Sequence, residues 1–353
     1  MLTQRHLLRG ALLLILVIVT FLVVLRFFPI GNDYFYYYRP IAEQWLNGDR
    51  TLYDGPNQRL FYPPWTLVVI LPLGPPSLEA GSALLNTASL LALLFSLYLH
   101  GQLATLPLYG VLLALLNLHT VDLFILAQLD LLALAGVMLA WWAFMKRRPL
   151  LVGLGFCLMS IKPLNLILLG ILFLMALRRW SRAEVLRAFL PPLVLLLVSS
   201  ALVGFDWPLK YIANFEEPVS TLGISVWRAA EAFGLPRGLP APLAIIALLA
   251  FLRVAWRDGL TERTLGLALA TNLAFTTYAH GHYYVLLIPV MIAVARHNRP
   301  LAVLAYVTTW APLLRSPFGF GASWVGVLYP LVLLAALWWF VPEKPRHPPE
   351  HAV

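Results

Sequence analysis

The chain has 353 residues, of which 61% are hydrophobic and 12% are charged, and its mean hydropathy is +0.81. These values exclude a soluble globular domain and indicate an integral membrane protein. The net charge of +9 is then expected to report membrane topology and not nucleic-acid binding. The single cysteine, Cys157, lies in an apolar run, which excludes a disulfide framework and a cysteine metal site.

The predicted helices follow the apolar segments of the chain. The first segment, residues 10–28, is longer than the apolar core of a signal sequence and precedes no A-x-A-like site. We therefore expect it to be a retained transmembrane helix. The further apolar segments lie at 63–73, 79–99, 103–117, 119–127, 129–145, 150–161, 163–177, 188–204, 241–256, 264–279, 283–296, 300–314 and 323–341.

Several of these segments are shorter than the about 20 residues that a helix needs to cross a bilayer. Short helices at membrane depth are tolerated only where protein or a water-filled cavity covers their ends. The stretches 103–127 and 150–177 are therefore expected to form re-entrant or buried hairpins that line a cavity. The expected fold class is all-α, a polytopic helical bundle with about 10–14 membrane segments, some of them short or re-entrant.

Lys and Arg cluster on one side of this topology if each segment reverses the direction of the chain. The clusters are QRHLLR, KRR at 146–148, RRWSRAEVLR, RVAWRDGLTER, RHNR and EKPRH. Because basic residues concentrate in cytoplasmic loops, we expect a multi-pass protein of the plasma (inner) membrane with both termini in the cytoplasm. The expected single domain covers residues 1–342, with extracytoplasmic loops at 30–62 and 205–240, and residues 343–353 form a short cytoplasmic tail.

The first extracytoplasmic loop sets one carboxylate, Asp33, between the first helix and a row of tyrosines. Its aromatic and aliphatic residues recur at helical spacing as far as Leu46, which predicts a helix lying along the membrane surface. Pro40 is a candidate first-turn residue of this helix, in which case residues 34–39 form a less regular lead-in. The simpler interpretation is an aromatic belt with a solvated acid beside it.

Polar residues interrupt the apolar segments at other points that this topology places on the same side. Lys162 is a functional candidate because a charge at membrane depth is costly, although a snorkelling lysine or a partner for Asp130 are simpler roles. Gln128 and Asp130 either hydrogen-bond a sugar or cap the break in their helix. His280 and His282 either bind phosphate or hydroxyl groups or are ordinary interfacial histidines, and their spacing is no metal signature.

Several short motifs occur in a recognisable order. They are Asp33 with Tyr37 and Tyr38, NGDRTLYD at 47–54, FYPPW at 61–65, AQLDLLAL at 127–134, IKPLNLILL at 161–169 and HGHYYVLLIP at 280–289. The set resembles glycosyltransferase family 87, the DUF2029 group of polyprenol-phosphate-sugar-dependent GT-C transferases, which includes bacterial mannosyltransferases. The resemblance covers most of the chain. It departs at 127–130, where the family commonly shows Gly-Gln-Val-Asn, and at Pro40, where the family helix has ordinary helix formers.

The resemblance implies a GT-C-type bundle that moves a hexose such as mannose from a polyprenyl-phosphate carrier to a hydroxyl of a glycolipid or glycan acceptor. Families of this kind use an acid in the first external loop as catalytic base, and the matching residue is Asp33. A carboxylate within hydrogen-bond reach can take the proton of a sugar hydroxyl, which is otherwise a poor nucleophile. The reaction implied is a direct inverting displacement of phosphate, with one carboxylate where glycosidases use two.

The other candidate residues are assigned to the donor or to the sugars. Donor phosphate-binding candidates are Lys162, His280, His282 and Arg59; candidates for binding the sugar or the acceptor are Tyr37, Tyr38, Gln128 and Asp130. An arginine in an external loop is more often simply solvated. No cofactor and no metal are expected, and the expected partners are the lipid-linked sugar donor, the acceptor and membrane lipids, with no nucleic acid.

A membrane permease or lipid flippase is the alternative function, with Asp33, Lys162 and the two histidines lining a pathway. A carrier needs a site near the midplane that opens to both sides, whereas the candidate groups gather on one face. The main evidence for the alternative is the pair His119 and Asp122. The assumed reversals of the chain place this pair at the inner end of a short hairpin, away from the proposed site.

Overall fold

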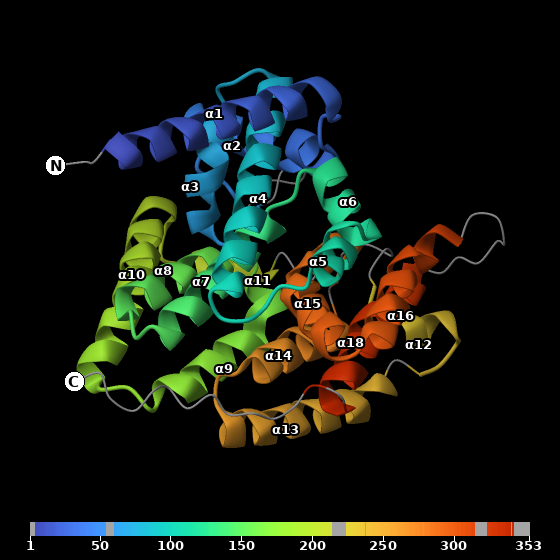
Figure 1. Ribbon diagram of the computed structural model, residues 1–353. Coiled ribbons are helices and arrows are strands. Elements are labelled where there is room, and N and C mark those ends of the chain that lie inside the picture. Colours follow the sequence, from blue (N-terminus) through green and yellow to red (C-terminus); the bar gives the residue numbers. More distant parts are fainter. Residues whose placement is uncertain are drawn as a thin grey trace.

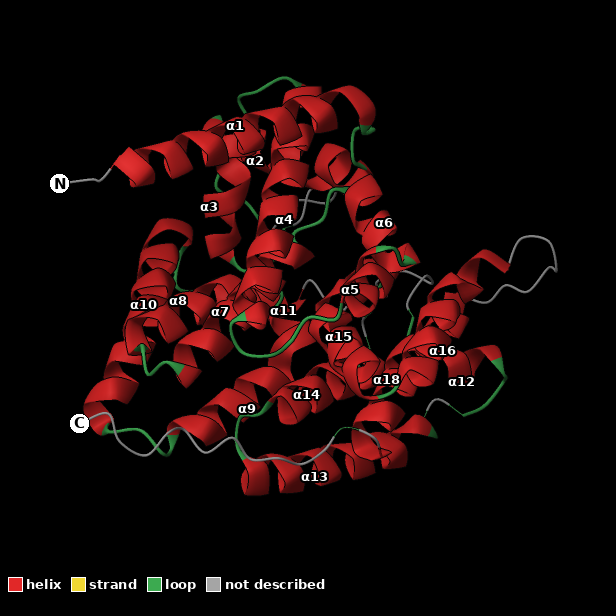
Figure 2. Cartoon of the chain, viewed as in Figure 1, coloured by secondary structure: helices red, strands yellow, loops and turns green. Residues whose placement is uncertain are grey.

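The computed structural model describes residues 4–53, 60–213, 224–236, 238–277, 279–314, 323–339 and 341. Within these residues the regular secondary structure is helical and contains no strand (Figure 1 and Figure 2). This confirms the predicted all-α class of a polytopic helical membrane protein. Arg59 and the predicted tail 343–353 lie outside the described residues.

The helices are joined by short 3₁₀ and π segments, which are labelled η. The first half of the chain contains α1 (Gln4–Phe27), η1 (Tyr34–Tyr38), α2 (Arg39–Leu46), η2 (Pro64–Thr66), α3 (Leu67–Ile70), η3 (Leu71–Leu73), α4 (Leu78–Gly101), α5 (Leu108–Leu115), α6 (Leu118–Leu126), α7 (Asp130–Met145), α8 (Pro149–Met159), η4 (Pro163–Leu166) and α9 (Ile167–Leu177). The second half contains α10 (Arg182–Val203), α11 (Trp207–Ala213), α12 (Val226–Ala232), α13 (Pro240–Asp258), α14 (Glu262–Phe275), η5 (Gly281–Leu287), α15 (Ile288–His297), α16 (Arg299–Trp310), η6 (Ala311–Leu314), η7 (Ser323–Val327) and α18 (Leu328–Trp339).

Three of the described helices, α4, α10 and α13, are long and apolar enough to cross a membrane by themselves. The shorter apolar helices lie at Leu14–Phe27, Pro64–Leu73, Asp130–Met145, Pro149–Met159, Pro163–Leu177 and Val325–Trp339. Figure 1 shows α4 running through the middle of the molecule, with α1 across its upper end and α13 along the bottom of the view. The short helices are covered by their neighbours, since α7 packs against α4, and α8 packs against α7 and α10.

Helices α5 and α6 together behave as one broken segment, because they meet at an angle of 49°. Asn117 caps α6 by accepting a hydrogen bond from the Thr120 backbone N–H at 2.9 Å, so α6 starts without a loop after α5. The prediction that the chain reverses direction between 117 and 119 is therefore wrong. The hydropathy pattern recorded the break but contained no information on its angle.

Four of the basic segments, 146–148, 178–187, 253–263 and 296–299, gather at one end of several helices, as contacts between distant residues show. Arg147 pairs with Glu184 at 3.4 Å, and Arg178 donates to the Trp256 carbonyl at 2.9 Å. Glu262, at the start of α14, pairs with both His100 and Arg296. Helices α4, α7, α8, α9, α14 and α15 thus each have one terminus at this basic end, and the opposite termini point toward the candidate site described below.

The segment after α1 follows the sequence prediction. Residues 34–38 form a π-helical turn, and α2 then begins with Pro40 in its first turn, where the missing N–H of proline costs no hydrogen bond. Tyr34 and Tyr38 are completely buried, whereas Tyr36 and Tyr37 are 62% and 42% exposed. The row of tyrosines therefore divides between the interior and the outside.

Candidate active site

The loop that carries Asp33 is fixed against the break between α6 and α7. Gly31 lies so close to Ala127 that a Cβ atom on Gly31 would be 2.3 Å from the Ala127 Cβ. Its backbone N–H donates to Ser82 Oγ of α4 at 3.0 Å. Ala127 has a φ of 54°, a left-handed conformation that ends α6. These contacts bring Asp33 beside Gln128, the next residue of the break.

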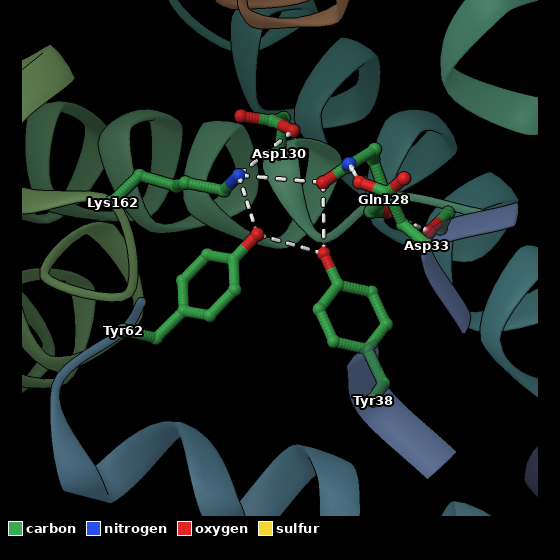
Figure 3. A network of polar contacts seen from close by, with 7 residues as sticks. Asp33, Tyr38, Tyr62, Gln128, Asp130 and Lys162 are labelled. Carbon is green, nitrogen blue, oxygen red and sulfur yellow. Dashed lines mark hydrogen bonds and ion pairs between the residues drawn. The ribbon is translucent and has the colours of Figure 1, made fainter. Parts of the chain in front are cut away.

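Six side chains from four parts of the chain meet here in a polar network (Figure 3), namely Asp33, Tyr38, Tyr62, Gln128, Asp130 and Lys162. The Tyr38 hydroxyl donates to Gln128 Oε1 at 2.8 Å and lies 2.8 Å from the Tyr62 hydroxyl. The Gln128 amide nitrogen donates to Asp33 Oδ2. The segments 33–38, 61–65, 127–130 and 161–165, which are far apart in sequence, therefore build one site.

Lys162 is the centre of the network. Its ammonium donates to the Tyr62 hydroxyl at 3.1 Å and to Gln128 Oε1 at 3.4 Å, and it lies 3.4 Å from Asp130 Oδ2. The ring centroids of Tyr62 and Tyr283 are 4.7 and 4.5 Å from the same nitrogen, which is cation–π distance. Lys162 is 4% exposed, so its charge is balanced by protein groups and not by bulk water.

The histidines predicted to bind phosphate lie next to this network. The rings of His280 and His282 stack at 5.5 Å, and both contact the ring of Tyr283 at 5.5 and 4.5 Å. Tyr283 in turn covers Lys162. Burial, reinforced by the charge of Lys162, lowers the pKa of His280 to about 4, so this histidine is neutral near pH 7.

His119 and Asp122 lie at the candidate site and not at the remote end predicted for them. A Cβ on Gly281 would be 3.3 Å from His119 Nδ1 and 3.6 Å from Asp122 Oδ2, so both side chains border the turn between the two histidines. The physical reason is the 49° bend, since α6 continues toward the site instead of turning back. The main evidence for a two-sided transport pathway is thereby removed.

Asp33 is a half-buried carboxylate with an unusual balance of charges around it. Burial raises its pKa to about 6, the nearby Lys162 ammonium opposes this rise, and the carboxylates of Asp130 and Asp122 add to it. Asp33 Oδ1 has no hydrogen-bond partner among the described residues. The site therefore holds one carboxylate oxygen by an amide and leaves the other available.

A small pocket opens beside Lys162, with a volume of about 30 Å³. Its lining residues are Phe61, Tyr62, Ile161, Lys162, Pro163, Leu164, Asn165, Tyr211 and Tyr283. This volume has room for a small number of water molecules.

Most of the predicted site residues lie in the network or beside it. Asp33, Tyr38, Gln128, Asp130 and Lys162 lie in one network, and the two histidines border it. Tyr37 is exposed and packs edge-on against Phe61 at 6.3 Å, outside the network. Tyr62 and Tyr283 were not predicted as site residues, although both lie inside motifs that carried the family resemblance. No group of three or more potential metal ligands occurs in the part of the chain that the structure describes.

The fold and the site define a helical membrane protein with a buried acid–lysine network at one end of its helices. A family model for glycosyltransferase family 87 matches residues 60–279, and the chain belongs to this family. The protein is therefore a glycosyltransferase with a sugar donor and an acceptor as substrates. The matched range includes Gln128, Asp130 and Lys162, ends just before His280, and begins after Asp33. Searches of curated proteins and of solved structures found no match.

Proposed function

We propose that the protein transfers a hexose, mannose in the first instance, from a polyprenyl-phosphate carrier to an acceptor hydroxyl at the extracytoplasmic face of the plasma membrane. The observation that carries the proposal is Asp33, a half-buried carboxylate held beside a buried lysine with one oxygen unpartnered among the described residues. An anionic donor and a neutral hydroxyl need these two groups, a cation and a base.

In the proposed step, Asp33 takes the proton of the acceptor hydroxyl as the hydroxyl oxygen bonds to the anomeric carbon. The bond between that carbon and the phosphate oxygen breaks, and the electron pair leaves with polyprenyl phosphate. Attack opposite the leaving group inverts the anomeric configuration. A base with a pKa of about 6 is ionised near neutral pH and is stronger than an ordinary aspartate.

The leaving phosphate is assigned to Lys162, His280 and His282, with Arg59 as a further candidate. Lys162 already donates to Tyr62 and Gln128 and forms an ion pair with Asp130, so phosphate would replace one of these partners. His280 is neutral near pH 7 and would contribute an N–H donor and not a positive charge. Tyr37, Tyr38, Gln128 and Asp130 remain candidates for contacts with the sugar or the acceptor.

The arrangement of the helices supports the proposed sidedness. The candidate site and the described basic clusters lie at opposite ends of α7, α8 and α9. Because basic loops face the cytoplasm, the site is assigned to the extracytoplasmic face, with both termini cytoplasmic. A lipid carrier suits a site built among apolar helices, and a glycolipid or glycan suits an acceptor approaching from outside.

The first test is transfer from radiolabelled polyprenyl-phosphate mannose, polyprenyl-phosphate glucose and nucleotide-linked mannose, in membranes with and without the protein. We expect protein-dependent labelling of a membrane glycolipid or glycan from a polyprenyl-phosphate donor, and a rate that falls as the pH drops below about 6 as Asp33 is protonated. Transfer from the nucleotide-linked donor alone, under conditions that prevent formation of the lipid-linked sugar, would contradict the proposed donor class.

A further inference from the structure

The polar network has a defined hydrogen-bond direction. A lysine ammonium only donates, so Lys162 donates to the Tyr62 hydroxyl. Tyr38 donates its single proton to Gln128 Oε1, and Tyr62 must therefore donate to Tyr38. The amide nitrogen of Gln128 then donates to Asp33. Every hydrogen bond from the ammonium to the carboxylate points the same way, and bonds aligned in this manner polarise one another.

The orientation of the Gln128 amide is fixed by its partners. Two donors, Tyr38 at 2.8 Å and Lys162 at 3.4 Å, converge on one atom, which must be the oxygen. The other atom is then the nitrogen, and it contacts the Asp33 carboxylate. A flipped amide would place the nitrogen against the lysine ammonium and the oxygen against the carboxylate, which would break the hydrogen bonds with Lys162 and Asp33.

The backbone at both ends of the contact is also held. The Gln128 N–H donates to the Leu123 carbonyl at 3.2 Å, and the Gln128 carbonyl accepts from Ser89 Oγ of α4 at 3.2 Å. On the other side, Gly31 is tied to Ser82 of the same helix at 3.0 Å. Helix α4 thus fixes both segments, and the Gln128 side chain spans the remaining distance to Asp33.

We propose that Gln128 is the positioning residue of the catalytic carboxylate. Its amide makes the last hydrogen bond of the chain that runs from Lys162 to Asp33, and this bond holds one oxygen of Asp33. The other oxygen is then presented to the acceptor hydroxyl. The inference rests on the proposed function of Asp33. It gives Gln128 a role inside the protein, in place of the contact with the sugar or the acceptor considered for it above.

The charged groups that face Asp33 set the expected pH effect. They are Lys162, before η4, and the carboxylates of Asp122 on α6 and Asp130 on α7; the hydroxyls of Tyr38 and Tyr62 are further titratable groups that interact with Asp33. A hydrogen bond donated to a carboxylate favours its ionised form, so loss of the Gln128 donor raises the pKa of Asp33. A rise of about one pH unit lowers the ionised fraction at pH 6 roughly fivefold.

The test uses Gln128→Met, which keeps the length of the side chain and removes the amide, in the full-length protein in membranes. We expect the acid limb of the pH–rate profile to move upward by about one unit, with the rate at pH 6 falling roughly fivefold and the KM for the donor unchanged. The matched control is Gln102→Met, at an exposed glutamine after α4, which should leave the profile unchanged.

A second measurement is independent of activity. Infrared titration of the Asp33 carboxyl, identified by its loss in Asp33→Asn, should show the same upward shift in Gln128→Met. If Gln128→Met does not fold, Gln128→Glu, which replaces the donor by an acceptor, should shift the titration in the same direction. An unchanged profile and an unchanged infrared midpoint would overturn the inference. If the wild-type protein transfers no sugar, the proposed function fails and the infrared shift alone decides the role of Gln128.

Discussion

Lys162 is a cation that is almost completely removed from water. Its side chain is 3% exposed and that of its partner Asp130 is 0% exposed, with 3.4 Å between the charged atoms. Removing one member of such a pair leaves an uncompensated charge, which costs about 3–5 kcal/mol, whereas replacing both by apolar groups costs far less. The pair therefore contributes to stability only while both residues are present.

This predicts a strongly non-additive result for two substitutions. Lys162→Met alone should lower the free energy of unfolding by about 3 kcal/mol, and Lys162→Met combined with Asp130→Leu should recover most of that loss. Thermal unfolding in detergent measures both changes. Lys210→Met is the control, because Lys210 forms an ion pair with Asp206 in which the two side chains are 40% and 59% exposed, respectively. Such an exposed pair should contribute at most about 1 kcal/mol. Equal destabilisation by the single and the double variant would contradict the prediction.

At the scale of single residues the sequence predicted side chains that the structure brings together, but not how these side chains are connected. Lys162 and Asp130 were predicted as a possible pair, because unpaired charges at membrane depth are costly. The rings of Tyr62 and Tyr283 around the ammonium were not predicted, since their contacts depend on how distant segments pack. The same applies to the direction of the hydrogen-bond chain, which requires distances between specific atoms.

Helices α7 and α8 pack closely enough that their contact depends on glycine. A Cβ on Gly155 would lie 2.6 Å from the backbone nitrogen of Ala140 and 2.8 Å from its Cα. A Cβ on Gly136 would lie 2.4 Å from the backbone nitrogen of Met159. Backbone atoms cannot rotate away as a side chain would, so the two helices would have to separate. Because Asp130 begins α7 and Lys162 follows α8, this contact also sets the geometry of the site.

Gly155→Ala is therefore expected to destabilise the protein by about 1–3 kcal/mol and to reduce transfer activity. The control is Gly170→Ala on α9, where a Cβ has no neighbour within 4 Å. This change should be neutral or stabilise by up to about 1 kcal/mol, because alanine favours the helix. Thermal unfolding and transfer assays on both variants test the difference. A Gly155→Ala variant as stable as Gly170→Ala would show that the helices can separate at little cost.

The apolar segments predicted which parts of the chain form helices, but they predicted the boundaries and directions of these helices less well. The segment 129–145 corresponds to α7, but 188–204 missed the first six residues of α10, whose polar first turn is closed by a capping box of Ser181 and Glu184. Capping and polar first turns are invisible to hydropathy alone. The wrong reversal near Asn117 has the same origin, since a break in hydropathy does not specify an angle.

At the scale of the whole molecule, the described residues form a basic end and an opposite end that carries Asp33, Lys162 and the two histidines His280 and His282. Helices α7, α8 and α9 connect the two ends, and the chain belongs to glycosyltransferase family 87. We propose that sugar transfer takes place at the second end. In the described part of the chain the candidate site lies at one end of these helices, which supports the proposed transfer from a lipid-linked donor at the membrane boundary. The catalytic role of Asp33 is the central claim on which this account depends.

The most direct test of that claim is single-turnover sugar transfer by Asp33→Asn, compared with wild type and with Asp122→Asn as the matched control. All three proteins are first checked for folding by gel filtration in detergent. Loss of a general base predicts a rate about 10²–10⁴-fold below wild type for Asp33→Asn with donor binding retained, and a much smaller loss for Asp122→Asn. A well-folded Asp33→Asn variant that transfers sugar at the wild-type rate would contradict the account.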